Sequence, residues 1–119
     1  MIYLSEHESL AALETLVHTR PLSATERYFS FQVEWDDELT EYFPIRKLPL
    51  GWNELPPTIA SRRIGDEWLE QQRSLVLAVP SLLSTSELNF LLNPNHSDFR
   101  RIKIHKPVEY RFDARLHGR

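Results

Sequence analysis

The chain has 119 residues, 41% of them hydrophobic and 26% charged, which is the balance of one soluble globular domain and not of a disordered or fibrous protein. It has no cysteine, so disulfide frameworks and thiolate metal sites are excluded, and it has no apolar run long enough to span a membrane. The 14 basic and 17 acidic residues give a net charge of −3, which disfavours direct binding of nucleic acid. Because the start lacks the pattern of a signal peptide, we expect a cytoplasmic protein.

The first third of the chain predicts a strand, a helix and a second strand. Residues 2–4 ("IYL") read as a short strand. Ser5 and Glu8 have the spacing of a capping box, and apolar residues then recur at helical spacing, so a helix is expected over residues 6–18. Residues 28–35 alternate between apolar and polar, which predicts one strand. Its expected buried face carries Phe29, Phe31, Val33 and Trp35.

The rest of the chain predicts a second helix and several short strands. Prolines and a glycine make residues 36–57 a long connection. Thr58 is the expected N-cap of a helix over residues 59–72, although Gly65 in its interior weakens it. Strands are expected at residues 74–79, 88–92, 101–105 and 109–113. The chain therefore predicts an α+β fold with a small, mostly antiparallel sheet and two helices.

Glu14 is the first candidate site residue. It lies four residues after Leu10 and three before Val17, so it borders the apolar stripe of the expected helix instead of opposing it. A carboxylate in this place either faces a cleft or is a surface glutamate that pairs with His18.

Other polar and aromatic residues stand near strand ends. Tyr3 would either stack on a flat ligand or fill the core. Ser81 follows a strand and a proline without a G-x-S-x-G motif, so we expect an exposed hydroxyl that either holds a ligand or belongs to an ordinary turn. Asn89, Asn93 and His96 would ordinarily cap turns.

Two common kinds of site have no pattern in this sequence. The histidines do not have the spacing of metal ligands, so no metal is expected. Gly-rich phosphate-binding motifs are also missing from the sequence, so a nucleotide would be bound by other side chains. The histidines are at positions 7, 18, 96, 105 and 117.

Several stretches together resemble the RES-domain family, the toxins of bacterial toxin–antitoxin pairs. This resemblance implies a single RES-type domain over residues 1–119, with a fold similar to that of the ADP-ribosyltransferase toxins and a cleft for NAD⁺. The stretches are "IYLSEHESLAALETLVH", "IASRRIGDEWLEQQRSLVLAVPS", "LNFLLNPNHSDF" and "YRFDARL".

The resemblance also implies the site and the reaction. Glu14 matches the family glutamate and Ser81 the family serine, both catalytic, while Tyr3, Ser81 and Asn89 would bind substrate. The implied reaction splits NAD⁺ at the nicotinamide–ribose bond by phosphorolysis or hydrolysis, with inorganic phosphate as a co-substrate and no cofactor. Two alternatives remain open, namely ADP-ribosyl transfer to a protein and an inactive remnant that only binds the antitoxin.

The resemblance further implies a partner and a departure from the family pattern. The partner is an antitoxin of the Xre helix-turn-helix type. The family arginine precedes the tyrosine by more residues than precede Tyr3 here, so that arginine and the first strand of the family are missing from this sequence. We therefore expect lower activity than in an extended form, and self-association through an open sheet edge.

Overall fold

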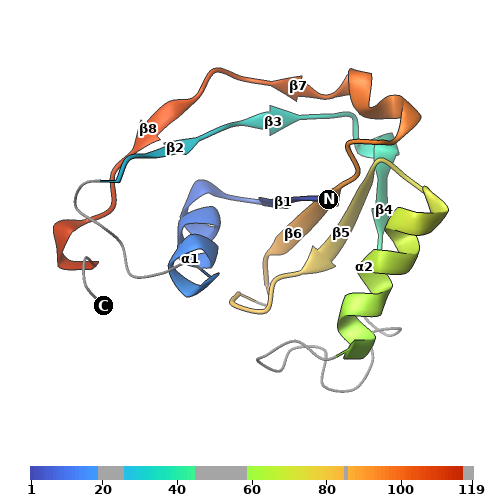
Figure 1. Cartoon of the computed structure of the whole chain (residues 1–119), viewed down its shortest axis with the longest axis horizontal. Helices are drawn as coiled ribbons and strands as arrows, with labels where there is room; N and C mark the ends of the chain where they lie inside the picture. The colour runs from blue at the N-terminus through green and yellow to red at the C-terminus, as the bar shows by residue number, and fades with distance from the viewer. Residues whose placement is uncertain (19–25, 45–58, 85, 117–119) are drawn as a thin grey trace.

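The structure, a computed structural model, describes residues 1–18, 26–44, 59–84 and 86–116 (Figure 1). Within these residues the fold is α+β, as the sequence predicts, with short 3₁₀ turns at Asp37–Leu39, Ser97–Arg101 and Ala114–Leu116. The helices are α1 (Glu8–His18) and α2 (Ile59–Gln71). The strands are β1 (Ile2–Ser5), β2 (Tyr28–Ser30), β3 (Val33–Glu34), β4 (Thr40–Tyr42), β5 (Val76–Pro80), β6 (Leu88–Leu92), β7 (Lys103–Ile104) and β8 (Val108–Tyr110).

One four-stranded sheet and one long ribbon make up the strands. The sheet has the order β1-β6-β5-β4, in which only the β4–β5 pair is parallel. Strands β2 and β8 pair antiparallel, as do β3 and β7. These four strands follow one another as a two-stranded ribbon that arches along the sheet on the side of β1 (Figure 1). We call them the ribbon.

The core lies on both faces of the central strands β5 and β6, because successive side chains of a strand point to opposite faces. On one face Val76 and Leu92 pack with Leu39 and with the half-buried Trp35, and Leu75, which precedes β5, joins this cluster. On the other face, Trp68 of α2 packs against Leu77 and Leu91 and is completely buried. The four residues of β5 from Val76 to Val79 are therefore the apolar centre of the molecule.

The two helices are short, with 11 residues in α1 and 13 in α2. Neither has the length and apolar character that crossing a membrane requires. Helix α2 approaches the sheet closely at Gly65, where a Cβ atom would lie 3.3 Å from Leu91 Cδ1 and 3.7 Å from Met1 Cε. A glycine in the middle of this helix is therefore explained by packing against β6.

The start of α1 differs from the prediction. The helix begins at Glu8, and Ser5 is the last residue of β1. The Ser5 hydroxyl donates to Asn89 Oδ1, and Glu8 Oε2 accepts a hydrogen bond from Ser30 Oγ of the ribbon. The predicted capping box is therefore wrong, because both of its side chains bond to other elements.

The strand predicted over residues 28–35 is divided into β2 and β3. Phe29 and Phe31 are 47% and 56% exposed, so their predicted burial is wrong. The ribbon is two strands wide, and the Arg27 guanidinium lies over the Phe29 ring, 5.3 Å from the ring centre. Period-two alternation indicated a strand correctly but could not show which face another layer would cover.

The predicted connection over residues 36–57 contains a missed element. Residues Thr40–Tyr42 form β4, which pairs in parallel with β5 through Thr40 and Val76. Three residues are too few to show an alternating pattern. The rest of this connection from residue 45, and the expected N-cap Thr58, lie outside the described residues.

Candidate active site

Three elements converge on the carboxylate of Glu14. Its Oε1 atom accepts a hydrogen bond from Ser81 Oγ at 3.1 Å and another from Asn89 Nδ2 at 2.9 Å. Glu14 lies on α1, Ser81 directly follows β5, and Asn89 lies on β6. The structure therefore brings together three of the four site residues that the family resemblance implies. Glu14 is half-buried against the sheet, and the side chain of His18, its alternative partner, lies outside the description.

Ser81 makes three hydrogen bonds with one oxygen atom. Its Oγ accepts from the backbone N–H groups of Leu83 at 3.1 Å and Ser84 at 3.2 Å, and it donates to Glu14. The residue has no exposed surface, so the prediction of an exposed hydroxyl is wrong. The turn folds back over the side chain because these N–H groups need an acceptor. With its lone pairs occupied, the hydroxyl has its proton directed at Glu14.

Asn89 uses both ends of its side-chain amide. Its Nδ2 donates to Glu14, and its Oδ1 accepts from Ser5 Oγ at 3.1 Å. Ser5 and Asn89 are cross-strand partners in the antiparallel pairing of β1 with β6, so their side chains point to the same face. Sequence reasoning missed Ser5 because its partner is 84 positions away. Only the strand register, known from the structure, places the side chains of Ser5 and Asn89 side by side.

Tyr3 lies on the same wall as these residues. It is two positions before Ser5 on β1, so both side chains lie on one face of the sheet, and its ring is 74% exposed. The alternative of a core tyrosine is therefore wrong. Tyr3, Ser5, Glu14 and Asn89 all line an open cavity of about 2220 Å³.

The cavity walls come from the sheet, both helices and the ribbon. Apolar side chains dominate the ribbon wall, where Ile104 and Val108 are 57% and 64% exposed. Among the described lining residues, Arg62 of α2 and Lys106 are the permanently charged basic side chains. A mainly apolar lining with a few polar groups on one wall is the usual composition of a small-molecule site, and this hollow is larger than the roughly 300–1,000 Å³ that such sites occupy.

A second hollow of about 580 Å³ lies between the ribbon and the turn before β4. Its one arginine, Arg101, lies 2.6 Å from Glu38 and 3.2 Å from Asp36. The hydrogen bond to Glu38 is the main cause of a raised pKa for Arg101. Since this cation is already paired with two carboxylates, the hollow is a weaker candidate than the cavity at Glu14.

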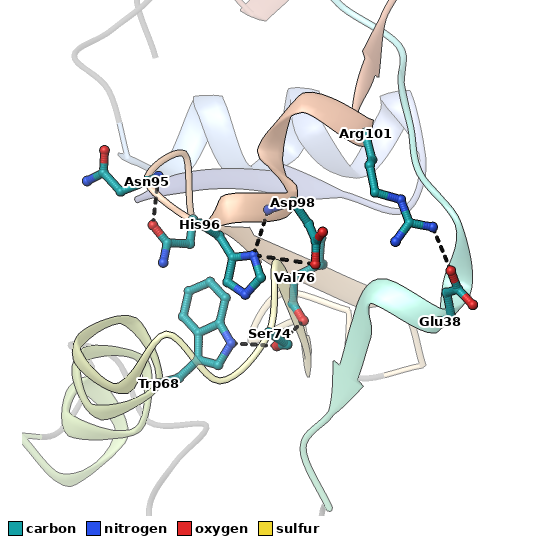
Figure 2. Close-up of polar contacts among 9 residues, drawn as sticks. Glu38, Trp68, Ser74, Val76, Asn95, His96, Asp98 and Arg101 are labelled. Carbon is teal, nitrogen blue, oxygen red and sulfur yellow. Dashed lines mark hydrogen bonds and ion pairs between the residues drawn. The ribbon is translucent and has the colours of Figure 1, made fainter.

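The remaining polar residues of the Asn–Pro–His run have structural roles at the other end of β6. The buried Asn93 accepts from the backbone N–H of Asn95 at 3.0 Å, and His96 Nδ1 accepts from that of Asp98 at 3.1 Å (Figure 2). The predicted capping role of Asn93 and His96 is confirmed. Nearby, Trp68 Nε1 donates to Ser74 Oγ at 2.7 Å, which in turn donates to the carbonyl of Val76 (Figure 2).

Metal-ligating side chains do not gather in the described part of the chain. Within it, no group of three or more histidine, aspartate or glutamate residues is arranged to hold an ion. The donors around Glu14 are a hydroxyl and an amide N–H, which are not metal ligands in this orientation.

A family model and several known proteins match this chain and indicate the same family. Residues 1–113 match the RES domain. A "Toxin Res" of Yersinia enterocolitica is 40% identical over 116 residues, which cover 97% of this chain and 76% of that protein. A "Prs ADP-ribosylating toxin" of Sphingobium is 32% identical over 119 residues, covering 98% and 74% of the two chains. A "Toxin Res" of Photorhabdus laumondii is 32% identical over 116 residues, covering 97% and 74%. The family that the sequence motifs predict is thus found over nearly all of the chain, and this protein belongs to the RES domain family.

Proposed function

We propose that this protein is the toxin of a toxin–antitoxin pair and that it cleaves NAD⁺ at the bond between nicotinamide and ribose. The observation that carries the proposal is the Glu14 carboxylate, oriented by Ser81 and Asn89 at the wall of an open cavity. The relatives named as toxins, one of them ADP-ribosylating, support both the biological role and the use of NAD⁺.

The chemistry of the bond explains why a fixed carboxylate is useful. As the bond to nicotinamide breaks, its electron pair goes to the ring nitrogen and positive charge develops on the ribose. A carboxylate held next to that charge stabilises the transition state electrostatically. Because both donors bond to Oε1, Glu14 does not need to reorient as the charge develops. Ser81 orients Glu14 in this proposal, and its complete burial argues against a nucleophilic role.

Two other features of the cavity fit the rest of the substrate. The exposed ring of Tyr3 provides a flat surface on which nicotinamide can stack, and nicotinamide leaves as a neutral ring that needs no proton. In this proposal the phosphates lie near Arg62 and Lys106, two basic side chains of the lining. Inorganic phosphate or water then attacks the ribose carbon, and the proton of that acceptor is released to solvent. No cofactor takes part, and NAD⁺ is a substrate.

ADP-ribosyl transfer to a protein is the second candidate, and the name of the Sphingobium relative favours it. It shares the bond cleavage and differs in the acceptor. The two are separated by incubating purified protein with NAD⁺ labelled in the adenylate half, with and without inorganic phosphate, and with a cell extract. Release of nicotinamide with a phosphate-dependent small product supports phosphorolysis, and label on protein supports transfer. If no nicotinamide is released in any mixture, catalysis is excluded and an inactive, antitoxin-binding protein remains.

The proposed partner is an antitoxin of the Xre helix-turn-helix type. Expression of the toxin alone should deplete intracellular NAD⁺ and stop bacterial growth, and co-expression of the antitoxin should restore both. Growth arrest at a normal NAD⁺ level would contradict the proposed reaction while leaving the toxin role intact.

A further inference from the structure

We propose that Ser5 is a positioning residue of this site, which holds the Asn89 side chain in place while its N–H end donates to Glu14. The observed chain of hydrogen bonds runs from Ser5 Oγ to Asn89 Oδ1 at 3.1 Å and from Asn89 Nδ2 to Glu14 Oε1 at 2.9 Å. The catalytic consequence rests on the function proposed above, but the orientation itself does not.

The two ends of the amide are chemically opposite. The N–H₂ end donates hydrogen bonds and the carbonyl end accepts them. A carboxylate only accepts, so it pairs with the N–H₂ end. If the Asn89 side chain were reversed, Oδ1 would face Glu14 Oε1 at the distance where Nδ2 now donates, and two acceptors would repel each other. In the observed orientation Oδ1 points at Ser5, whose hydroxyl supplies the donor that this oxygen needs.

The backbone holds Ser5 in place for this contact. Ser5 pairs with Asn89 across the β1–β6 ladder. Glu6, the next residue, makes two hydrogen bonds with Leu88 at the end of the strand. Glu6 N donates to the Leu88 carbonyl at 3.1 Å, and Glu6 Oε1 accepts from Leu88 N at 2.8 Å. Helix α1 begins three residues later at Glu8, so the hydroxyl is not used as a helix cap.

The arrangement therefore has two levels. Asn89 and Ser81 touch Glu14 directly, and Ser5 acts only through Asn89. A serine that served packing alone would be replaced by alanine without any effect on the Asn89 amide. If Ser5 positions Asn89, its replacement by alanine changes the surroundings of the amide, and this change can be measured.

The kinetic test compares Ser5→Ala, Ser5→Thr and the control Ser9→Ala, since Ser9 is exposed on α1, the helix that carries Glu14. We expect Ser5→Ala to lower kcat about fivefold at an unchanged KM, the effect of losing one hydrogen bond. Ser5→Thr, which keeps the hydroxyl and suits a strand, should restore kcat, and Ser9→Ala should leave it unchanged. Equal losses in Ser5→Ala and Ser5→Thr would overturn the proposal.

A double-mutant comparison tests the route through Asn89. In an Asn89→Leu background, Ser5→Ala should have no further effect on kcat, because the amide that it orients is gone. If the two effects multiply, Ser5 acts independently of Asn89 and the proposal is wrong.

Nuclear magnetic resonance separates this inference from the proposed function, because it needs no turnover. The side-chain N–H₂ signals of Asn89, identified by their loss in Asn89→Leu, should shift in Ser5→Ala and stay near their wild-type positions in Ser5→Thr and Ser9→Ala. If wild-type protein does not cleave NAD⁺, the proposed function fails while these signals still decide on Ser5. Unchanged Asn89 signals in Ser5→Ala would overturn the inference even if NAD⁺ cleavage is found.

Discussion

Glu14 shows how hydrogen bonds from distant segments give a carboxylate a defined orientation. Its Oε1 atom accepts from one hydroxyl and one amide, contributed by two segments far away in the sequence. Both of these donors are neutral groups, so these two bonds orient the oxygen without themselves being ion pairs. These two bonds therefore hold one oxygen of the carboxylate in a fixed direction.

We predict that Glu14→Gln keeps the fold and lowers NAD⁺ cleavage about 10²–10³-fold, the usual effect of removing one preorganised charge. Glutamine retains an oxygen that can accept from Ser81 and Asn89, so the structural contacts survive. Nicotinamide release and thermal unfolding measure the two effects. Glu70→Gln, which changes an exposed glutamate of α2, is the matched control. Full activity of Glu14→Gln would remove Glu14 from the mechanism.

Ser81→Ala should destabilise the protein as well as reduce its activity. The change removes the acceptor of the Leu83 and Ser84 N–H groups and one donor to Glu14, at a residue with no exposed surface. The expected loss is about 1–2 kcal/mol in the free energy of unfolding, measured by urea titration. Ser86→Ala, at an exposed turn position, should change it little. A stability equal to that of the wild type would show that the turn satisfies its N–H groups in another way.

Part of this site could be predicted from the sequence. The helical spacing around Glu14 indicated a side chain at the border of the apolar stripe, and the family motifs indicated Ser81 and Tyr3. The burial of Ser81 depends on how its turn closes, and the partnership of Ser5 depends on strand register. Local periodicity predicts neither the burial of Ser81 nor the partner of Ser5, because both depend on how the chain folds around these residues.

At the scale of elements, helix α2 and strand β6 are coupled by the small size of Gly65. Alanine would raise helix propensity by about 1 kcal/mol, but its Cβ would lie 3.3 Å from Leu91 Cδ1. We predict that these terms oppose each other, so Gly65→Ala changes the free energy of unfolding by less than about 1 kcal/mol. Gly65→Leu should lose about 1–3 kcal/mol through overpacking. Urea titration measures both, and a Gly65→Leu protein as stable as the wild type would contradict the close approach.

The ribbon contains an ion pair that should make its stability depend on pH. Arg27 Nη2 lies 3.1 Å from Glu109 Oε2, and this hydrogen bond, together with the charge of Arg27, lowers the pKa of Glu109 below its ordinary value of 4.5. A carboxyl with a lowered folded pKa contributes stability above pH 4.5, and that contribution is lost as the pH falls through the folded pKa. Glu109→Gln should therefore be less stable than the wild type at neutral pH and equally stable in strong acid.

Urea titrations of wild type and Glu109→Gln across this pH range test the prediction. Glu67→Gln, an exposed position of α2, is the control. Because the pair is exposed, added salt should shrink the difference at neutral pH. A difference that persists in strong acid would mean that Glu109 acts through packing and not through its charge.

The elements themselves differed in how well the sequence predicted them. Both helices and strands β5 and β6 were predicted because their apolar patterns are long or continuous. Strand β4 was missed because its three residues join the sheet through pairing with β5 and not through a pattern of their own. The burial of Phe29 was predicted wrongly, since alternation shows that two faces exist but not which face is covered.

At the scale of the whole molecule, the sheet and the ribbon differ in burial. Strand β5 is almost completely buried between two neighbours, whereas β2 and β8 are short, exposed or half-buried strands that pair with each other. We predict that amides of the ribbon exchange with solvent through local opening at a lower free energy than those of β5. Native-state hydrogen exchange measures both. Equal exchange free energies in the two parts would show that the ribbon and the sheet unfold as one unit.

The hydrogen bonds at Glu14 also set the point in protein synthesis at which the site can form. They join Glu14 to residues 67 and 75 positions later, and Ser5 to a residue 84 positions later. Chains grow from the N-terminus, so the helix that carries the carboxylate leaves the ribosome long before Ser81 and Asn89 do. A nascent or prematurely terminated chain that ends before β6 cannot make the bond from Asn89. Under the proposed function, a cell that makes this protein would meet its activity only after β5 and β6 have been translated, and an antitoxin that is already present could bind the toxin as it forms.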